Sequence, residues 1–279
     1  MKVLSLDGGG VRGVLQARVL QRLEGRRPFL DKIDRFAGAS IGAVNAAWLA
    51  TGRPLDTLID LYRKAGPFIF GKQSRSIAFF AKAALRTQLK SYLGDVRLRD
   101  LQRPVLCGAV GFKGAHFFDP FQSPDRDELL VDVVLAATAA VPFLPPHKGY
   151  VDGGLLANDP AAVALKWLPR LGEAACDRPS DHGGGDCGLR AVSLLSIGTG
   201  ECPTKPQSFL GTLVSAVGLG QRAVTELTCV AALGDRYHRA QPLLPKVVDL
   251  NDADAIPDLV RYANSWDERP TLAWIRQQF

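Results

Sequence analysis

The sequence lacks any apolar run that approaches the roughly 20 residues needed to cross a bilayer. Its first residues also lack a secretory signal: one lysine and a very short apolar run precede Asp7, and no small-residue cleavage site follows. These absences predict a cytoplasmic protein, with membrane contact, if any, confined to its surface.

Cysteine is scarce, and the spacing of the cysteines is not that of a disulfide framework. The five cysteines form no paired C-x-x-C sets, which argues against structural disulfides and favours reduced thiols. Cys176, His182 and Cys187 share one glycine-rich loop, but their spacing departs from that of standard zinc sites. The sequence therefore predicts no metal.

Length and charge set the scale of the protein. The chain has 279 residues, 47% of them hydrophobic, which fits one domain over 1–279 with a sizeable core. The net charge of +6 is uneven, because residues 61–103 hold ten Lys/Arg and only two Asp. Such a local concentration of positive charge favours an anionic partner surface.

Strand and helix patterns alternate along the chain. Short apolar runs predict strands, with helices at 41–50 and 127–140 and a mostly helical, basic segment at 53–103. The predicted strands cover residues 3–6, 33–37, 105–110 and 192–197, with further strand signals at 117–118 and 246–250. This order predicts an α/β three-layer sandwich with a mostly parallel central sheet, in which 53–103 forms a helical cover or lid and 172–190 a polar loop.

Gly38-Ala39-Ser40-Ile41-Gly42 fits G-x-S-x-G and lies between a predicted strand and a predicted helix. That context suits a nucleophile elbow, a sharp turn that lifts a serine clear of the sheet. The partial positive charge at the start of the following helix would favour negative charge developing near Ser40.

Residues 7–13, DGGGVRG, also fit the dinucleotide pattern G-x-G-x-x-G through Gly8, Gly10 and Gly13. A dinucleotide site needs an acidic residue at the end of the second strand, where this chain instead has the GASIG turn. Consecutive glycine amides at a helix start can hold a transient oxyanion equally well. The two motifs together favour an oxyanion hole over a nucleotide loop.

With Asp152-Gly153-Gly154, these two motifs resemble the three signatures of patatin-like phospholipases, in the family's order. The resemblance continues through residues 136–146, Asn158-Asp159-Pro160, residues 196–200 and residues 237–244, although Asp159 replaces a commoner Asn. It extends over roughly residues 2–250 and implies a patatin-like fold.

The resemblance implies a role for each matching residue. Ser40 would be the nucleophile and Asp152 its partner in a Ser–Asp dyad. The oxyanion hole would comprise Gly8, Gly9 and Gly10, with Arg12 supporting that loop, and the supporting motif residues would be Asp7, Gly13, Gly38, Gly42, Gly153 and Gly154. The family also implies that no cofactor, and no calcium, is required.

The identity of the general base is open at the level of sequence. A Ser, Asp, His order would require His182 or His238, whereas His116 and His147 precede Asp152. His182 lies in a glycine-rich tip that would position its side chain poorly, and a surface or structural role is favoured for each of the four. Asp152 could also simply cap its glycine turn, as Asp-Gly-Gly sequences often do.

The expected activity is hydrolysis of fatty-acyl esters of phospholipids or lysophospholipids through an acyl–Ser40 intermediate. A general esterase, thioesterase or acyltransferase would use the same site. The chain could instead be an effector switched on by a nucleotide, as in some bacterial relatives of the family, or a silent binding protein. Phenylalanines and basic residues at 61–103 suit either a membrane interface or a buried helical face, and no nucleic-acid module is present.

Overall fold

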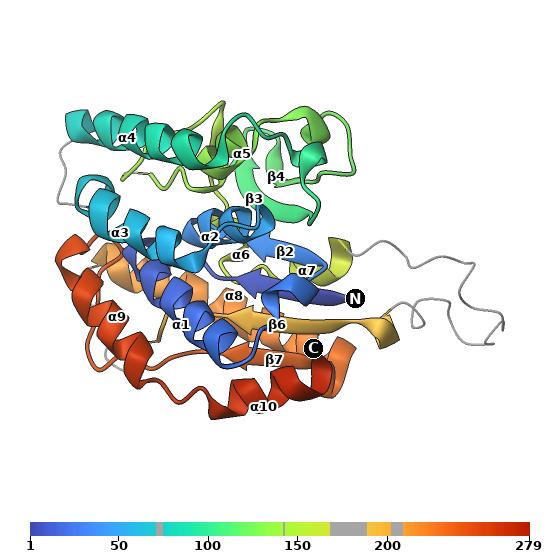
Figure 1. Ribbon diagram of the computed structural model, residues 1–279. Coiled ribbons are helices and arrows are strands. Elements are labelled where there is room, and N and C mark those ends of the chain that lie inside the picture. Colours follow the sequence, from blue (N-terminus) through green and yellow to red (C-terminus); the bar gives the residue numbers. More distant parts are fainter. Residues whose placement is uncertain (71–74, 142, 168–188, 202–208) are drawn as a thin grey trace.

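The computed structural model describes residues 1–70, 75–141, 143–167, 189–201 and 209–279, and the side chains of 75–81, 190 and 209–217 are outside this description (Figure 1). Its centre is one seven-stranded sheet in the order β4-β3-β2-β1-β6-β7, with β5 paired to β3. The strands are β1 (Lys2–Leu6), β2 (Arg35–Gly38), β3 (Val105–Gly111), β4 (Gly114–Phe118), β5 (Tyr150–Asp152), β6 (Ser193–Ile197) and β7 (Tyr237–Ala240). All neighbours from β3 to β7 are parallel, and β4 and β5 run antiparallel to β3.

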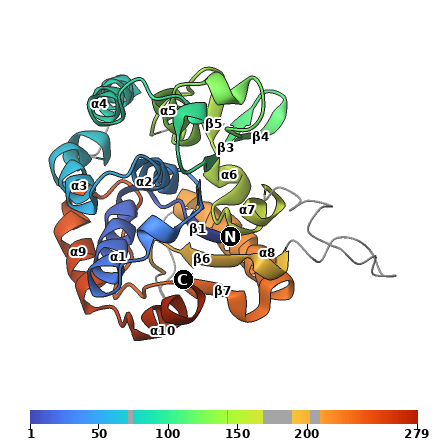
Figure 2. The ribbon, with the colours of Figure 1, turned by 45° about the vertical axis from the view of Figure 1, so that its right-hand side comes forward.

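Alternate residues of the strands face two separate cores. Leu4 and Leu6 of β1 join one core, while Val3 joins the other. The first core lies under α1 (Gly13–Arg26), α2 (Ile41–Ala50), α3 (Leu55–Phe70), α5 (Leu130–Ala137) and α9 (Ile256–Ser265). The second lies under α7 (Ala161–Trp167) and α8 (Phe209–Leu233), and Figure 2 shows the sheet between α1 and α8. The predicted three-layer α/β architecture is confirmed.

The basic segment is helical where it is described, as α3 and α4 (Arg75–Leu93). Leu85 and Leu89 of α4 are buried in the first core. Lys82 donates to the carbonyl of Pro146 at 2.6 Å, and Arg86 lies 3.6 Å from the carboxylate of Asp132 on α5. The described part of α4 is thus attached to α5 and to the proline segment that leads into β5.

Two local predictions differ from the structure, and two short strands are additional to those predicted. The helix expected at 127–140 is only α5, because Leu129 pairs with Arg97 in an isolated bridge and Thr138 leaves the helical conformation. The strand expected at 246–250 is wrong, since these residues form a loop whose Leu250 carbonyl accepts the Val11 amide at 2.8 Å. The strand of this region is β7, and the short β5 was not predicted.

The loop that carries Cys176, His182 and Cys187 lies outside the described residues. The remaining helices are α6 (Gly154–Ala157) and α10 (Arg269–Gln278), which packs beside β7. Within the described ranges, no helix combines the length and apolarity required to cross a membrane.

Candidate active site

Ser40 stands on a strained turn between β2, which ends at Gly38, and α2, which begins at Ile41. Its backbone has φ 50° and ψ −124°, a conformation that residues with a side chain rarely adopt. The flanking glycines are required by close backbone contacts. A Cβ on Gly42 would lie 2.1 Å from the Leu6 carbonyl oxygen, and one on Gly38 would lie 2.4 Å from the Gly42 carbonyl oxygen.

Strand register brings Asp152 to Ser40. On β3, Cys107 pairs with Gly38 of β2, and Ala109 pairs with Asp152 of β5. Because β4 already occupies the other edge of β3 at both positions, β5 must continue the line of β2 beyond its end. The two side chains meet there, and the Ser40 hydroxyl donates a hydrogen bond to Asp152 Oδ2 at 2.5 Å.

Asp152 is almost fully buried, with 4% of its surface exposed. Burial disfavours the carboxylate and raises its pKa to about 6, against the lowering effect of hydrogen bonds from the Ser40 hydroxyl and the Gly154 amide. The Gly154 amide lies 2.6 Å from Asp152 Oδ1 and leaves Oδ2 for the serine. The carboxylate is therefore oriented and more basic than in water, as proton transfer from a serine requires.

The glycine loop packs directly against the serine, since a Cβ on Gly8 would lie 3.1 Å from Ser40 Cβ. The Gly8 amide, however, already donates to the Asn158 carbonyl at 2.9 Å. The oxyanion role expected of Gly8 therefore does not fit this conformation. The Gly9 and Gly10 amides have no acceptor among the described residues, and Gly10 has a φ of 57°, which favours glycine.

Arg12 and Gly13 hold this loop in place. Arg12 donates from Nε to the Gly9 carbonyl and from Nη1 to the Gly200 carbonyl, each at 3.4 Å. A Cβ on Gly13 would lie 2.3 Å from the hydroxyl of Tyr62, so glycine lets α1 approach α3 closely. These contacts agree with a supporting role for both residues.

The glycines after Asp152 also lie close to their neighbours, Gly153 more so than Gly154. A Cβ on Gly153 would lie 2.0 Å from the Gly108 carbonyl oxygen of β3, and one on Gly154 would lie 3.0 Å from Asp152 Oδ1. Small residues at both positions let the aspartate turn fit between β3 and the serine.

The described histidines form hydrogen bonds with residues other than Ser40 and Asp152. His116 lies 3.0 Å from Asp125, His147 lies 3.0 Å from Asp132, and His238 lies 2.9 Å from the hydroxyl of Thr271. His182 is outside the described residues. Within the described ranges, no group of three or more His, Cys, Asp or Glu side chains could hold a metal ion.

Sequence reasoning assigned no role to three residues that position the loop. Asn158 fixes Gly8 through its carbonyl, and Thr199 donates from Oγ1 to the Gly8 carbonyl at 2.9 Å. Arg239 binds Asp7, the first residue of the loop, through both of its terminal nitrogens. All three lie in tracts that resemble the family, which was the signal available for finding them.

A buried aspartate bound to a serine on a strained turn, beside a glycine loop, is an arrangement suited to acyl transfer. The family model described as patatin-like phospholipase matches residues 4–165. The chain belongs to the patatin-like phospholipase family, whose members are lipid hydrolases.

Two curated relatives align with most of the chain. Protein teg of Priestia megaterium is 24% identical over 338 residues, covering 100% of this chain and 98% of the relative. A cGAMP-activated phospholipase of Vibrio cholerae serotype O1 is 28% identical over 305 residues, covering 95% of this chain and 82% of the relative.

Among solved structures, VipD from Legionella pneumophila aligns with a TM-score of 0.42 and 13% identity. The alignment covers 93% of this chain and 66% of the VipD chain, so this chain spans just under two thirds of that structure.

Proposed function

We propose that the protein is a serine acyl hydrolase that cleaves fatty-acyl esters of phospholipids or lysophospholipids through Ser40 and Asp152. The observation that carries this proposal is the 2.5 Å hydrogen bond from the Ser40 hydroxyl to a buried carboxylate with a raised pKa. The catalytic unit is the single domain formed by residues 1–279, with α3 and α4 as its basic helical cover.

In the first half-reaction, Ser40 Oγ attacks the ester carbonyl carbon while its proton moves to Asp152 Oδ2. The carbonyl oxygen becomes an oxyanion, which the Gly9 and Gly10 amides would stabilise. When the tetrahedral intermediate collapses, the alcohol portion of the lipid leaves with the proton from Asp152, and an acyl–Ser40 ester remains.

In the second half-reaction, Asp152 takes a proton from a water molecule that attacks the acyl carbon. The second tetrahedral intermediate collapses to a free fatty acid, and the proton returns to Ser40 Oγ. A carboxylate whose pKa is about 6 is ionised at neutral pH, so one group can serve as base in both halves.

Exposed apolar side chains lie on the segments that flank Asp152, and they support a lipid substrate. Leu155, which follows Gly154, is 63% exposed, and Val141 in the preceding segment is 58% exposed. That segment is joined to the aspartate strand, because the Asp152 amide donates to the Ala139 carbonyl at 3.1 Å. We propose that this apolar rim receives acyl chains, with the basic residues in the sequence of 61–103 adding peripheral contact to anionic lipid.

The relatives named cGAMP-activated phospholipases favour a second, regulatory proposal: that a cyclic dinucleotide increases the activity of this protein. Thermal unfolding with and without cGAMP tests it, since a ligand that binds only the folded state raises the transition temperature. Vesicle assays in the presence and absence of cGAMP then show whether binding changes turnover. The absence of both effects would rule out this nucleotide.

The decisive experiment measures fatty-acid release from mixed phospholipid vesicles by wild type, Ser40→Ala and Asp152→Asn. Ser265→Ala is a matched control, because Ser265 is exposed at the end of α9. We expect release by wild type and the control only, with Ser40 labelled by a fluorophosphonate probe. Undiminished release by Ser40→Ala would remove Ser40 from the mechanism, and undiminished release by Asp152→Asn would remove the dyad.

A further inference from the structure

A buried arginine on a strand that supplies no catalytic group contacts both loops of the site. Arg239 lies on β7, where its neighbour in the sheet is Ser196 of β6. Only 7% of its side chain is exposed, and its face of the sheet is the one covered by α7 and α8. A buried guanidinium is retained at such a position only with acidic or other acceptor groups around it.

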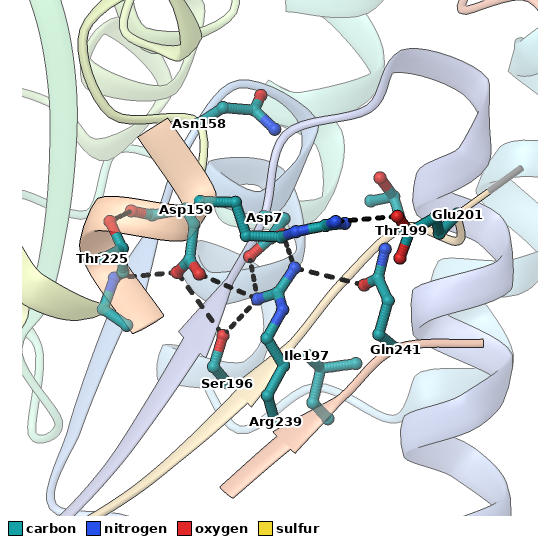
Figure 3. A network of polar contacts seen from close by, with 12 residues as sticks. Asp7, Asn158, Asp159, Ser196, Ile197, Thr199, Glu201, Thr225, Arg239 and Gln241 are labelled. Carbon is teal, nitrogen blue, oxygen red and sulfur yellow. Dashed lines mark hydrogen bonds and ion pairs between the residues drawn. The ribbon is translucent and has the colours of Figure 1, made fainter. Parts of the chain in front are cut away.

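Figure 3 shows the acceptors that surround this guanidinium. Nη1 and Nη2 donate to the two carboxylate oxygens of Asp7, at 3.2 and 2.5 Å, in a bidentate pair. Nη1 also donates to Asp159 Oδ2 at 2.9 Å and to the hydroxyl of Ser196 at 2.7 Å, and Nη2 donates to Gln241 at 3.2 Å.

The two carboxylates belong to different loops, and those loops meet at Gly8. Asp7 directly precedes Gly8, and Asp159 directly follows Asn158. The Gly8 amide donates to the Asn158 carbonyl at 2.9 Å, and the Asn158 side-chain amide donates to the Gly8 carbonyl at 3.3 Å. Arg239 therefore joins the two loops through Asp7 and Asp159, each one residue away from the contact between Gly8 and Asn158.

We propose that Arg239 is a positioning residue, which fixes the glycine loop against the 158–159 turn so that the Gly9 and Gly10 amides face the reacting carbonyl. This inference rests on the proposed function, because it concerns the oxyanion amides of that reaction. The loop has little room to adjust by itself. A Cβ on Gly9 would lie 2.1 Å from Thr199 Oγ1, and one on Gly10 would lie 2.2 Å from the Leu250 carbonyl oxygen.

Arg239 could act only by neutralising the buried carboxylates, or it could also position the glycine loop. A conservative substitution distinguishes these two roles. Lysine at position 239 keeps one positive charge beside Asp7 and Asp159 but cannot form the bidentate pair. If Arg239 only neutralises buried charge, Arg239→Lys should behave like wild type. If it positions the loop, Arg239→Lys should release the Gly8 contact and misplace the amides.

The test combines amide hydrogen exchange with steady-state kinetics on Arg239→Lys. Arg236→Lys is the matched control, because Arg236 lies three residues away and donates instead to the Leu189 carbonyl. We expect exchange at the Gly8 amide to rise at least about tenfold, with Leu4 and Leu195 of the central strands unchanged, as in local opening. We also expect kcat to fall about 10- to 100-fold with KM nearly unchanged, since misplaced oxyanion donors weaken only the transition state.

Unchanged Gly8 exchange in Arg239→Lys would overturn the proposal, and so would faster exchange with wild-type kcat. A rise in KM alone would overturn the oxyanion role, because it would place the effect in substrate binding. If wild type neither releases fatty acid nor is labelled at Ser40, the proposed function fails separately. Hydrogen exchange then still decides whether Arg239 fixes the loop.

Discussion

Replacing Ser40 by glycine is expected to give a more stable protein than replacing it by alanine. Both variants lack the hydroxyl, so both leave Asp152 without its serine partner, and they differ only in the Cβ at a backbone with φ 50°. Such a conformation costs a residue with a side chain about 1–3 kcal/mol. Glycine avoids that cost but loses about 0.5–1 kcal/mol through its greater freedom in the unfolded chain. The expected net gain is about 1 kcal/mol in favour of Ser40→Gly.

The assay is denaturant unfolding of both variants at pH 7, with equal m-values required before the free energies of unfolding are compared. Ser265 provides the control pair, because it ends α9 and its φ is not positive. There the order should reverse, with Ser265→Gly less stable than Ser265→Ala. A Ser40→Ala variant as stable as Ser40→Gly, or more so, would refute the claim that the nucleophile turn is strained.

The remaining predictions concern pH and the glycine loop. Because Asp152, with a pKa of about 6, must be ionised to accept the serine proton, fatty-acid release at low substrate should fall about tenfold per pH unit below 6; a rate unchanged from pH 7 to pH 5 would contradict this. Burial and the neighbouring Asp159 raise the pKa of Asp7 to about 7, against the lowering effect of its partner Arg239, so the stability that protonated Asp7 contributes is present below about pH 4 and is lost as pH rises through 7. The free energy of unfolding in urea should therefore decrease from about pH 4 to about pH 7, and an increase over this range would be the opposite result. Gly9→Ala should lower kcat about 100-fold or more, since its Cβ would collide with Thr199 and displace an oxyanion amide, whereas Gly25→Ala, in open space on α1, should not; equal rates would exclude Gly9 from the site.

Most of the sheet could be predicted because its strands are buried on both faces. Residues 3–6, 105–110 and 192–197 are short apolar runs that end at glycines, and each forms a strand. The run at 246–250 also contains a short apolar stretch, Val247-Val248, but it packs as a loop over the glycine motif. Composition could not distinguish the runs that form strands from the run that forms a loop, since tertiary contacts decide whether a short apolar run pairs with a neighbouring strand.

The strand β7 was missed for the opposite reason. Its sequence, Tyr237-His238-Arg239-Ala240, has two adjacent polar residues at its centre, which interrupt the apolar run that would indicate a buried strand. The structure buries Arg239 because Asp7 and Asp159 accept its hydrogen bonds, and these partners are 232 and 80 positions away in the sequence. No local pattern encodes such a pairing. The serine and the aspartate could be found because their glycine neighbours form short motifs, but the network that supports them could not.

The position of the candidate site follows from the strand order. The chain leaves β1 at Asp7, β2 at the turn of Ser40, and β6 at Gly198 to Gly200. These three strands are adjacent and parallel, so their carboxyl ends form one edge, where backbone groups are free to bind a substrate. β1 is the middle strand of the three, which places its glycine loop between the nucleophile on one side and Thr199 on the other. Arg239 on the next strand, β7, then reaches Asp7 across β6 from a sheet position one residue before that edge. A site assembled in this way depends on the sheet for its geometry, so a change that frees the loop should lower kcat while the central strands remain protected from exchange.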